Sequence, residues 1–162
     1  MVLVIGYGNE LRRDDGAGLR LAERMVERWQ AADIPLRHLA VQQLTPELAV
    51  EIAEPGVTAV VFVDARAGLP GSATDGVTVT ALASASLASP SLGHHTQPEV
   101  LLAYADLLLE GRPAPPAWLV ATPGVDFAHG EGLSAAASAA IQSAFSQHDH
   151  ALMRLLESLQ RS

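Results

Sequence analysis

Two aspartates and a pair of histidines are the residues of this sequence best suited to chemistry. Asp15 stands at the expected start of a helix, Asp64 follows an apolar run, and His94 and His95 precede a later helix. Two carboxylates and one imidazole suit a borderline divalent metal such as zinc or nickel, with coordination positions left open for substrate or water. We therefore take Asp15, Asp64 and one of the two histidines as a candidate site.

The aspartates also have ordinary structural explanations. An acid at a helix start often caps the helix, and we favour that interpretation for Asp14. Asp15 is followed by Gly16 and Gly18, and a glycine costs up to ~1 kcal/mol relative to alanine within a helix. Their presence predicts that another part of the chain approaches this backbone closely. Asp64 is equally compatible with a turn after its strand.

Geometry limits how many of the histidines can belong to the candidate site. Adjacent side chains of an extended segment point in opposite directions, so only one of His94 and His95 is expected to face a shared site. Ordinary structural roles are the simpler interpretation for the other four, which are His38, His129, His148 and His150.

Several other kinds of site are excluded by the residues themselves. The turn that begins at Gly6 is not a dinucleotide fingerprint, because the third glycine of Gly-x-Gly-x-x-Gly would fall on Leu11. No Gly-Lys-Ser/Thr, Gly-x-Ser-x-Gly or His-Glu-x-x-His motif occurs. The chain contains no cysteine, which excludes disulfides, thiolate zinc sites and thiol nucleophiles.

The composition of the chain indicates where the protein is located and which classes of partner it is expected to bind. The chain has 162 residues, 18 acids, 10 bases that are all arginine, and a formal net charge of −8. This balance disfavours nucleic acid as a partner, since a general binder needs basic patches. No apolar run reaches the ~18 residues of a membrane span, and the amino terminus lacks the charged region of a signal peptide. We expect a cytoplasmic protein with one domain over residues 1–162 and no membrane partner.

Alternating strands and helices must position the candidate residues. The apolar runs predict strands at Val2–Ile5, Leu36–Val41, Val57–Val63, Val77–Thr80 and Trp118–Ala121. Helix patterns run from about Asp15 to Gln30, from Thr45, from Pro98, and as one long helix from Ser134 almost to the end. This order predicts a three-layer α/β/α sandwich with a mostly parallel sheet. In such folds the sites lie at the carboxyl ends of the strands.

The opening Val4-Ile-Gly6-Tyr-Gly8-Asn9-x5-Asp15-Gly16-x-Gly18 resembles that of the hydrogenase maturation proteases. These endopeptidases trim the C-terminus of the large subunit of nickel–iron hydrogenases. Three later segments resemble the family's in the same order: Val61-Phe-Val-Asp64-Ala, Gly93-His94-His95-x-x-Pro98 and Gly130-Glu-Gly132-Leu-Ser134. The resemblance covers nearly the whole chain and implies a phosphorylase/hydrolase-like sandwich.

What the resemblance implies is a peptidase whose metal belongs to the substrate. Asp15, Asp64 and His94 would contact nickel already inserted into the large-subunit precursor, and no tightly bound cofactor is expected. His94 is preferred to His95 because the family's histidine often stands four residues before a proline, here Pro98. Asp15 and Asp64 would be catalytic, either because the metal polarises the carbonyl or activates water, or because a carboxylate acts as the base.

One segment departs from the family's pattern. Some members have an acid followed by two glycines and a threonine after the second strand, whereas this chain has Gln42 and Gln43 there. Their amides can hydrogen-bond a peptide but supply no fourth acid. The departure disfavours a mechanism that depends on that acid and is compatible with a subgroup that serves a different hydrogenase.

Two alternatives remain at this point. A peptidyl-tRNA hydrolase-like enzyme also begins with an apolar strand and Gly-x-Gly-Asn, but the absence of lysine and the weak match beyond Asn9 count against it. The other alternative is a non-catalytic metal-sensing module that docks on a partner during assembly.

Overall fold

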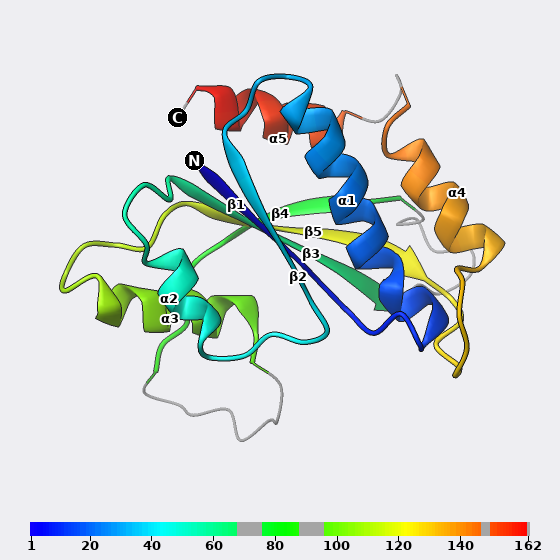
Figure 1. The fold of residues 1–162 in the computed structure, drawn as a ribbon, viewed down its shortest axis with the longest axis horizontal. Coiled ribbons are helices and arrows are strands. Elements are labelled where there is room, and N and C mark those ends of the chain that lie inside the picture. Colours follow the sequence, from blue (N-terminus) through cyan, green and yellow to red (C-terminus); the bar gives the residue numbers. More distant parts are fainter. Residues whose placement is uncertain (68–75, 88–95, 147–149, 162) are drawn as a thin grey trace.

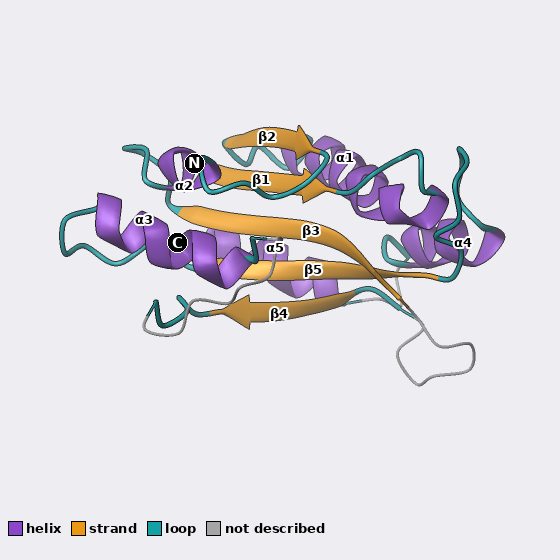
Figure 2. Ribbon diagram, turned by 90° about the horizontal axis from the view of Figure 1, so that it is seen from below, coloured by secondary structure: helices purple, strands orange, loops and turns teal. Residues whose placement is uncertain are grey.

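The computed structural model describes residues 1–67, 76–87, 96–146 and 150–161. Its five-stranded sheet has the order β2-β1-β3-β5-β4 (Figures 1 and 2). The strands are β1 (Val2–Tyr7), β2 (Leu36–Val41), β3 (Ala59–Ala67), β4 (Thr78–Leu82) and β5 (Ala117–Gly124). All neighbouring strands are parallel except β4, which runs antiparallel to β5. The predicted mostly parallel sheet is confirmed.

Helices cover both faces of this sheet. The first face carries α1 (Ala17–Gln30), α4 (Ala135–Ser143) and α5 (Ala151–Gln160), and the second carries α2 (Leu48–Ile52) and α3 (Pro98–Leu108) (Figure 1). Each face has its own apolar core, centred on α1 in one case and on α2 and α3 in the other. The central strands are buried on both sides, as their unbroken apolar runs predict. None of the described helices has the length and apolar character needed to cross a membrane.

The predicted long helix at the end of the chain is wrong. Helix α4 ends at Ser143, and α5 begins only at Ala151. The amide groups of Phe145 and Ser146 bond three residues back, to Gln142 and Ser143, so the chain tightens into turns there. In the sequence, residues 146–149 are all polar, so this stretch lacks the apolar stripe that is typical of a helix packed on a core.

The two predicted site aspartates lie close to the carboxyl edge of the sheet. Asp15 belongs to a short 3-10 turn, Arg13–Gly16, that precedes α1, rather than to the helix itself. Asp64 lies inside β3, which continues to Ala67 instead of ending at the predicted Val63. Both displacements are local, and both aspartates line one cleft at this edge. Figure 2 shows that β1 and β3 point toward the same side of the molecule.

Candidate functional site

A cleft of about 370 Å³ at the carboxyl edge of the sheet brings Asp15 and Asp64 together. The two residues reach it from different elements, the turn before α1 and strand β3. The convergence follows from the parallel arrangement, because the strands β1 and β3 end on the same side. Other residues on its wall are Tyr7, Gly8, Asn9, Arg12, Gln42, Gln43, Leu44, Ala65 and Thr96.

The glycine turn after β1 wraps around Asp15. The carboxylate oxygen Oδ2 of Asp15 accepts a hydrogen bond of 2.8 Å from the backbone N–H of Asn9. Gly8 has a φ of +148°, and a Cβ atom on it would lie 2.0 Å from the carbonyl oxygen of Asp15. Only glycine fits such a position. The turn therefore fixes both the backbone and one carboxylate oxygen of Asp15.

Asp64 is held between β3 and the first turn of α1. Its Oδ1 atom accepts a hydrogen bond of 2.8 Å from the N–H of Ala65. A Cβ atom on Gly18 would lie 2.7 Å from the Cα atom of Asp64, so α1 packs directly on the backbone of this residue. The close approach predicted from the glycines is confirmed at Gly18.

Burial makes the Asp64 carboxyl a weak acid. Loss of solvent and, to a smaller extent, the nearby charge of Asp15 raise the pKa of Asp64, whereas the hydrogen bond from the Ala65 N–H and the nearby Tyr7 hydroxyl lower it. The balance of these effects raises the pKa of Asp64 to about 6. Burial and the charge of Asp64 also raise the pKa of Tyr7 well above its ordinary value, so this phenol stays protonated. The cleft thus contains two carboxylates close enough to repel each other.

The predicted third ligand, His94, lies outside the described residues, and so does its alternative, His95. Within the described ranges, no group of three His, Cys, Asp or Glu side chains is placed to hold a metal. Thr96 is the first described residue after the two histidines, and it lines the same cleft as the aspartates. Of the three predicted metal contacts, the structure therefore describes only Asp15 and Asp64, and the role of all three residues stays a prediction.

Asp14 does not cap its own helix, and that prediction is wrong. Its side chain is fully buried and reaches the segment between β5 and α4. Oδ1 accepts from the N–H of Ser134 at 2.7 Å, and Oδ2 accepts from the N–H groups of Val125 at 2.8 Å and Asp126 at 3.0 Å. The Ser134 hydroxyl donates to the same Oδ2 at 2.6 Å.

These hydrogen bonds decide the charge state of Asp14. Burial acting alone would raise the pKa of Asp14, but the bonds from Ser134, Val125 and Asp126 together lower it below its ordinary value. Ser134 also caps α4, because its Oγ accepts from the N–H of Ala137 at 3.1 Å. Asp14 therefore ties the turn that carries Asp15 to the start of α4. The capping serine is a recognisable sequence signal, but its pairing with Asp14 is not.

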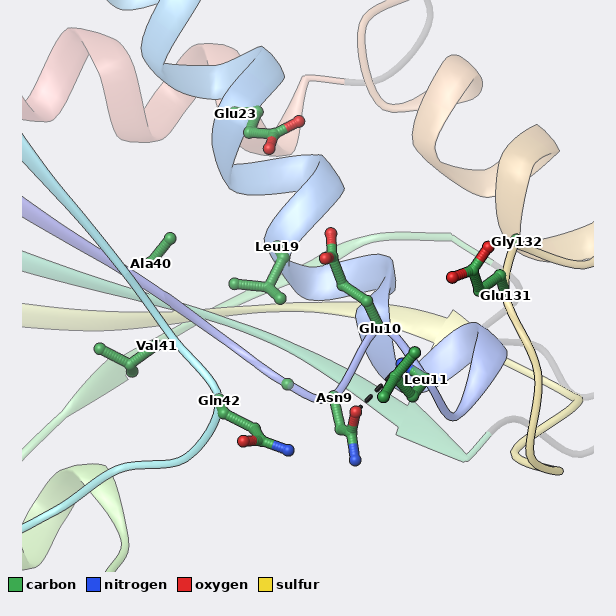
Figure 3. A pocket seen from close by; sticks show the side chains of 11 residues that line it. Asn9, Glu10, Leu11, Leu19, Glu23, Ala40, Val41, Gln42, Glu131 and Gly132 are labelled. Carbon is green, nitrogen blue, oxygen red and sulfur yellow. Dashed lines mark hydrogen bonds between the residues drawn. The ribbon is translucent and has the colours of Figure 1, made fainter.

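A second and larger hollow of about 670 Å³ adjoins the cleft (Figure 3). The two hollows share Gly8, Asn9 and Gln42. Figure 3 shows the side chain of Asn9 bonded to the turn that follows it, with Gln42 at the end of the neighbouring strand. The carboxylates of Glu10, Glu23 and Glu131 lie around the larger hollow.

Gln42 and Gln43, where some proteases of the resembled family have an acid, lie on the cleft wall with exposed side chains. Their position beside the aspartates fits hydrogen bonding to a peptide backbone.

Comparison with known proteins establishes a shared fold. No family model and no curated protein matches the sequence. Among solved structures, the [NiFe] hydrogenase maturation protease HybD from Thermococcus kodakarensis is 19% identical, over 98% of this chain and 97% of that chain, with a TM-score of 0.62. The hydrogenase maturating endopeptidase HybD from E. coli is 21% identical, over 99% and 92%, with a TM-score of 0.57. The [NiFe] hydrogenase maturation protease HycI from Thermococcus kodakarensis KOD1 is 17% identical, over 98% and 92%, with a TM-score of 0.59.

Proposed function

We propose that this protein is an endopeptidase that removes the C-terminal tail of the nickel-loaded large subunit of a nickel–iron hydrogenase during maturation. The observation that carries the proposal is the cleft in which Asp15 and Asp64 meet, on a fold shared along almost the whole chain with two structures named as hydrogenase maturation enzymes. The large-subunit precursor would be its macromolecular partner, and the cytoplasm its place of action.

The site would sense the nickel of its substrate through Asp15, Asp64 and His94. Each carboxylate has one oxygen fixed by a backbone N–H, from Asn9 and from Ala65 respectively. A cation between the carboxylates would offset the repulsion and the burial that together raise the pKa of Asp64. Oxygen ligands on the protein leave room for the ligands that the substrate brings with its metal.

The histidine is proposed from its distance along the chain. Thr96 lines the cleft, and two residues of chain span at most ~7 Å, so His94 is within reach of the site. We prefer His94 to His95 for its spacing from Pro98. The metal would enter with the precursor, so the protein by itself would hold no tightly bound ion.

Two ways of activating water are compatible with this cleft. The substrate's nickel can polarise the scissile carbonyl or a bound water molecule. Alternatively, Asp64 can accept the proton of the attacking water, and its raised pKa makes it a stronger base than an ordinary aspartate. In the first case Asp15 and Asp64 would hold the substrate's metal, and in the second Asp64 would act on the attacking water while Asp15 stays beside it in the cleft.

The experiment is incubation with a hydrogenase large-subunit precursor that carries its C-terminal extension, with and without nickel, followed by mass measurement. We expect one cut in the nickel-loaded precursor only. Asp15→Asn and Asp64→Asn should each slow the cut by about 100-fold or more, the scale of acid–base catalysis. Asp33→Asn is the matched control, because Asp33 is exposed and its φ of 57° suits asparagine.

Three outcomes would contradict the proposal. An uncut nickel-loaded precursor would remove the endopeptidase function, and stable binding without cutting would favour the non-catalytic metal-sensing module. Normal cutting by both site variants would remove the assignment of Asp15 and Asp64. Stoichiometric zinc or nickel that survives treatment of the free protein with a chelator would indicate an ordinary metallopeptidase instead.

A further inference from the structure

Among the described residues that line the cleft, Arg12 is the one with a positive charge. Its backbone is fixed on two sides. It forms a β-bridge with Gly130, in the loop before α4, and its carbonyl oxygen accepts from the N–H of Asp15 at 3.0 Å. The N–H of Gly130 donates to the carbonyl oxygen of Leu11 at 2.9 Å, and the N–H of Arg13 donates to that of Gly130 at 3.1 Å. Arg12 therefore starts from a well-held position close to Asp15 in the chain.

The guanidinium of Arg12 is directed by one hydrogen bond. Its Nε donates to the carbonyl oxygen of Phe127 at 3.3 Å. Arg12 follows β1 and Phe127 follows β5, and the sheet places β3, which carries Asp64, between these two strands. The bond thus joins the segments on either side of the strand that contributes Asp64 to the cleft.

The terminal amino groups of Arg12, Nη1 and Nη2, remain available to a ligand. The exposed side chain has no ion pair, and these two groups have no hydrogen-bond acceptor, among residues 1–67, 76–87, 96–146 and 150–161. Two parallel N–H donors on a planar cation match the oxygens of a carboxylate or of a similar anion. The geometry of Arg12 therefore suits an anionic group of the substrate.

Peptide hydrolysis creates such a group inside this cleft. The water oxygen forms a bond to the scissile carbonyl carbon, and an electron pair moves onto the carbonyl oxygen. The C=O bond then forms again as the C–N bond breaks. One water proton goes to the leaving amine, and the other is released when the new carboxyl group ionises. Asp15 and Asp64 repel this negative charge, and a fixed cation lowers that cost.

We propose that Arg12 binds the negative oxygen that forms at the scissile carbonyl, first in the tetrahedral intermediate and then in the new C-terminal carboxylate. This inference rests on the proposed function and adds a catalytic residue to it. The guanidinium keeps its charge at every pH at which the site works. The peptide carbonyl is neutral before the attack, so Arg12 contributes mainly to the rate of the cut and little to binding of the precursor.

The first test compares Arg12→Gln with Arg112→Gln in cleavage of a nickel-loaded large-subunit precursor. Arg112 is also exposed, but it lies beside Thr58, on the side of the sheet where β3 begins. Arg12→Gln should lower kcat by about tenfold or more, the factor for a hydrogen bond to a charged group, and leave KM nearly unchanged. Arg12→Lys, which keeps the charge without the planar pair of donors, should lie between Arg12→Gln and the wild type. Arg112→Gln should leave both constants unchanged.

Two kinetic outcomes would overturn the inference. A wild-type kcat in Arg12→Gln would show that Arg12 does not contact the reacting oxygen. A loss confined to KM would show that it binds an acidic group already present in the uncut precursor.

The second test uses sodium acetate as the probe and needs no precursor. The NMR signal of the Arg12 Nε–H is assigned by its loss in Arg12→Gln. We expect acetate to shift this signal saturably and the Arg112 signal far less, whereas sodium chloride at the same ionic strength shifts neither appreciably. Equal responses to the two salts would overturn the carboxylate site. An uncut precursor together with an acetate-specific shift would count against the proposed function and not against anion binding by Arg12.

Discussion

Asp14 and Asp64 are carboxylates near the same edge of the sheet, but their surroundings shift their pKa values in opposite directions. Asp14 is fully buried and accepts hydrogen bonds from Ser134, Val125 and Asp126, which lower its pKa. Asp64 borders a cleft, has fewer donors and faces the charge of Asp15, and its pKa rises to about 6. A carboxylate whose bonding capacity is used by the fold is structural. A carboxylate that has lost solvent without gaining enough hydrogen bonds in return can still bind a cation or a proton.

The comparison also separates two adjacent residues. Asp14 and Asp15 are neighbours in the sequence, yet the first turns into the protein and the second lines the cleft. The 3-10 turn at Arg13–Gly16 permits this divergence, because successive side chains leave such a turn in different directions. Asp14 thus anchors the turn, while Asp15 faces the cleft.

The largest expected effect on stability is that of Asp14→Ala. Removing the carboxylate leaves buried donors of Val125, Asp126 and Ser134 without an acceptor, which should cost about 3 kcal/mol or more of unfolding free energy. Urea unfolding of the two proteins at neutral pH measures this difference. Asp64→Ala is the matched substitution and should cost far less. Equal losses from the two substitutions would contradict the division into a structural and a functional carboxylate.

The second prediction concerns the pH dependence of stability in the protein without metal. The folded-state pKa of Asp64, about 6, lies above the ordinary aspartate value of 3.8, so the folded state binds the proton more tightly than the unfolded state. The stability contributed by this proton is present below pH ~4 and is lost as the pH rises through about 6, a change of up to about 3 kcal/mol. Asp14, whose pKa is lowered, acts with the opposite sign and loses its contribution as the pH falls.

Urea unfolding of the wild type and of Asp64→Asn between pH 4 and pH 7 isolates this effect. The variant should be about as stable as the wild type at the acid end and more stable than it near neutrality. A difference between the two proteins that does not change with pH would show that Asp64 titrates in the folded protein as it does in the unfolded one.

Local sequence patterns were sufficient to predict most of the fold and the position of the two candidate site aspartates, Asp15 and Asp64. The apolar run at Val2–Ile5 could only be a strand buried on both faces, and alternation with amphipathic helices then required a parallel sheet. In such a sheet, Asp15 and Asp64 must approach the same edge. These predictions succeed because they depend on periodicity within each segment and on a general rule of topology.

The feature of the site that sequence patterns missed depends on contacts between distant segments. The partners of Asp14 lie more than one hundred residues away, and no local signal announces them. The break between α4 and α5 was missed because the apolar spacing continues across Phe145 and Leu152 while the residues between them are polar.

The third prediction tests whether Asp64 depends on close packing that Asp14 does not share. Gly18→Ala places a methyl group 2.7 Å from the Cα atom of Asp64, where backbone must move. We expect a loss of about 1–3 kcal/mol in unfolding free energy, despite the better helix propensity of alanine, together with slower precursor cleavage. Gly76→Ala is the control, because no atom of the described residues lies within 4 Å of its added Cβ, and it should be neutral. Neutral behaviour of Gly18→Ala would remove the close packing as a constraint on the site.

The smallest expected effect is that of Ser134→Ala, which distinguishes the role of the Ser134 hydroxyl from that of its backbone N–H. Ser134→Ala removes the donor to Oδ2 of Asp14 and the cap that accepts from Ala137, but it keeps the N–H that donates to Oδ1. We expect a loss of about 1–2 kcal/mol in thermal or urea unfolding, smaller than that of Asp14→Ala, and recovery in Ser134→Thr. The cut of a precursor should continue in Ser134→Ala, because Asp14 keeps its backbone donors and Asp15 keeps its bond to Asn9. A loss of cleavage as large as that of Asp64→Asn would mean that the anchor and the site are not separable.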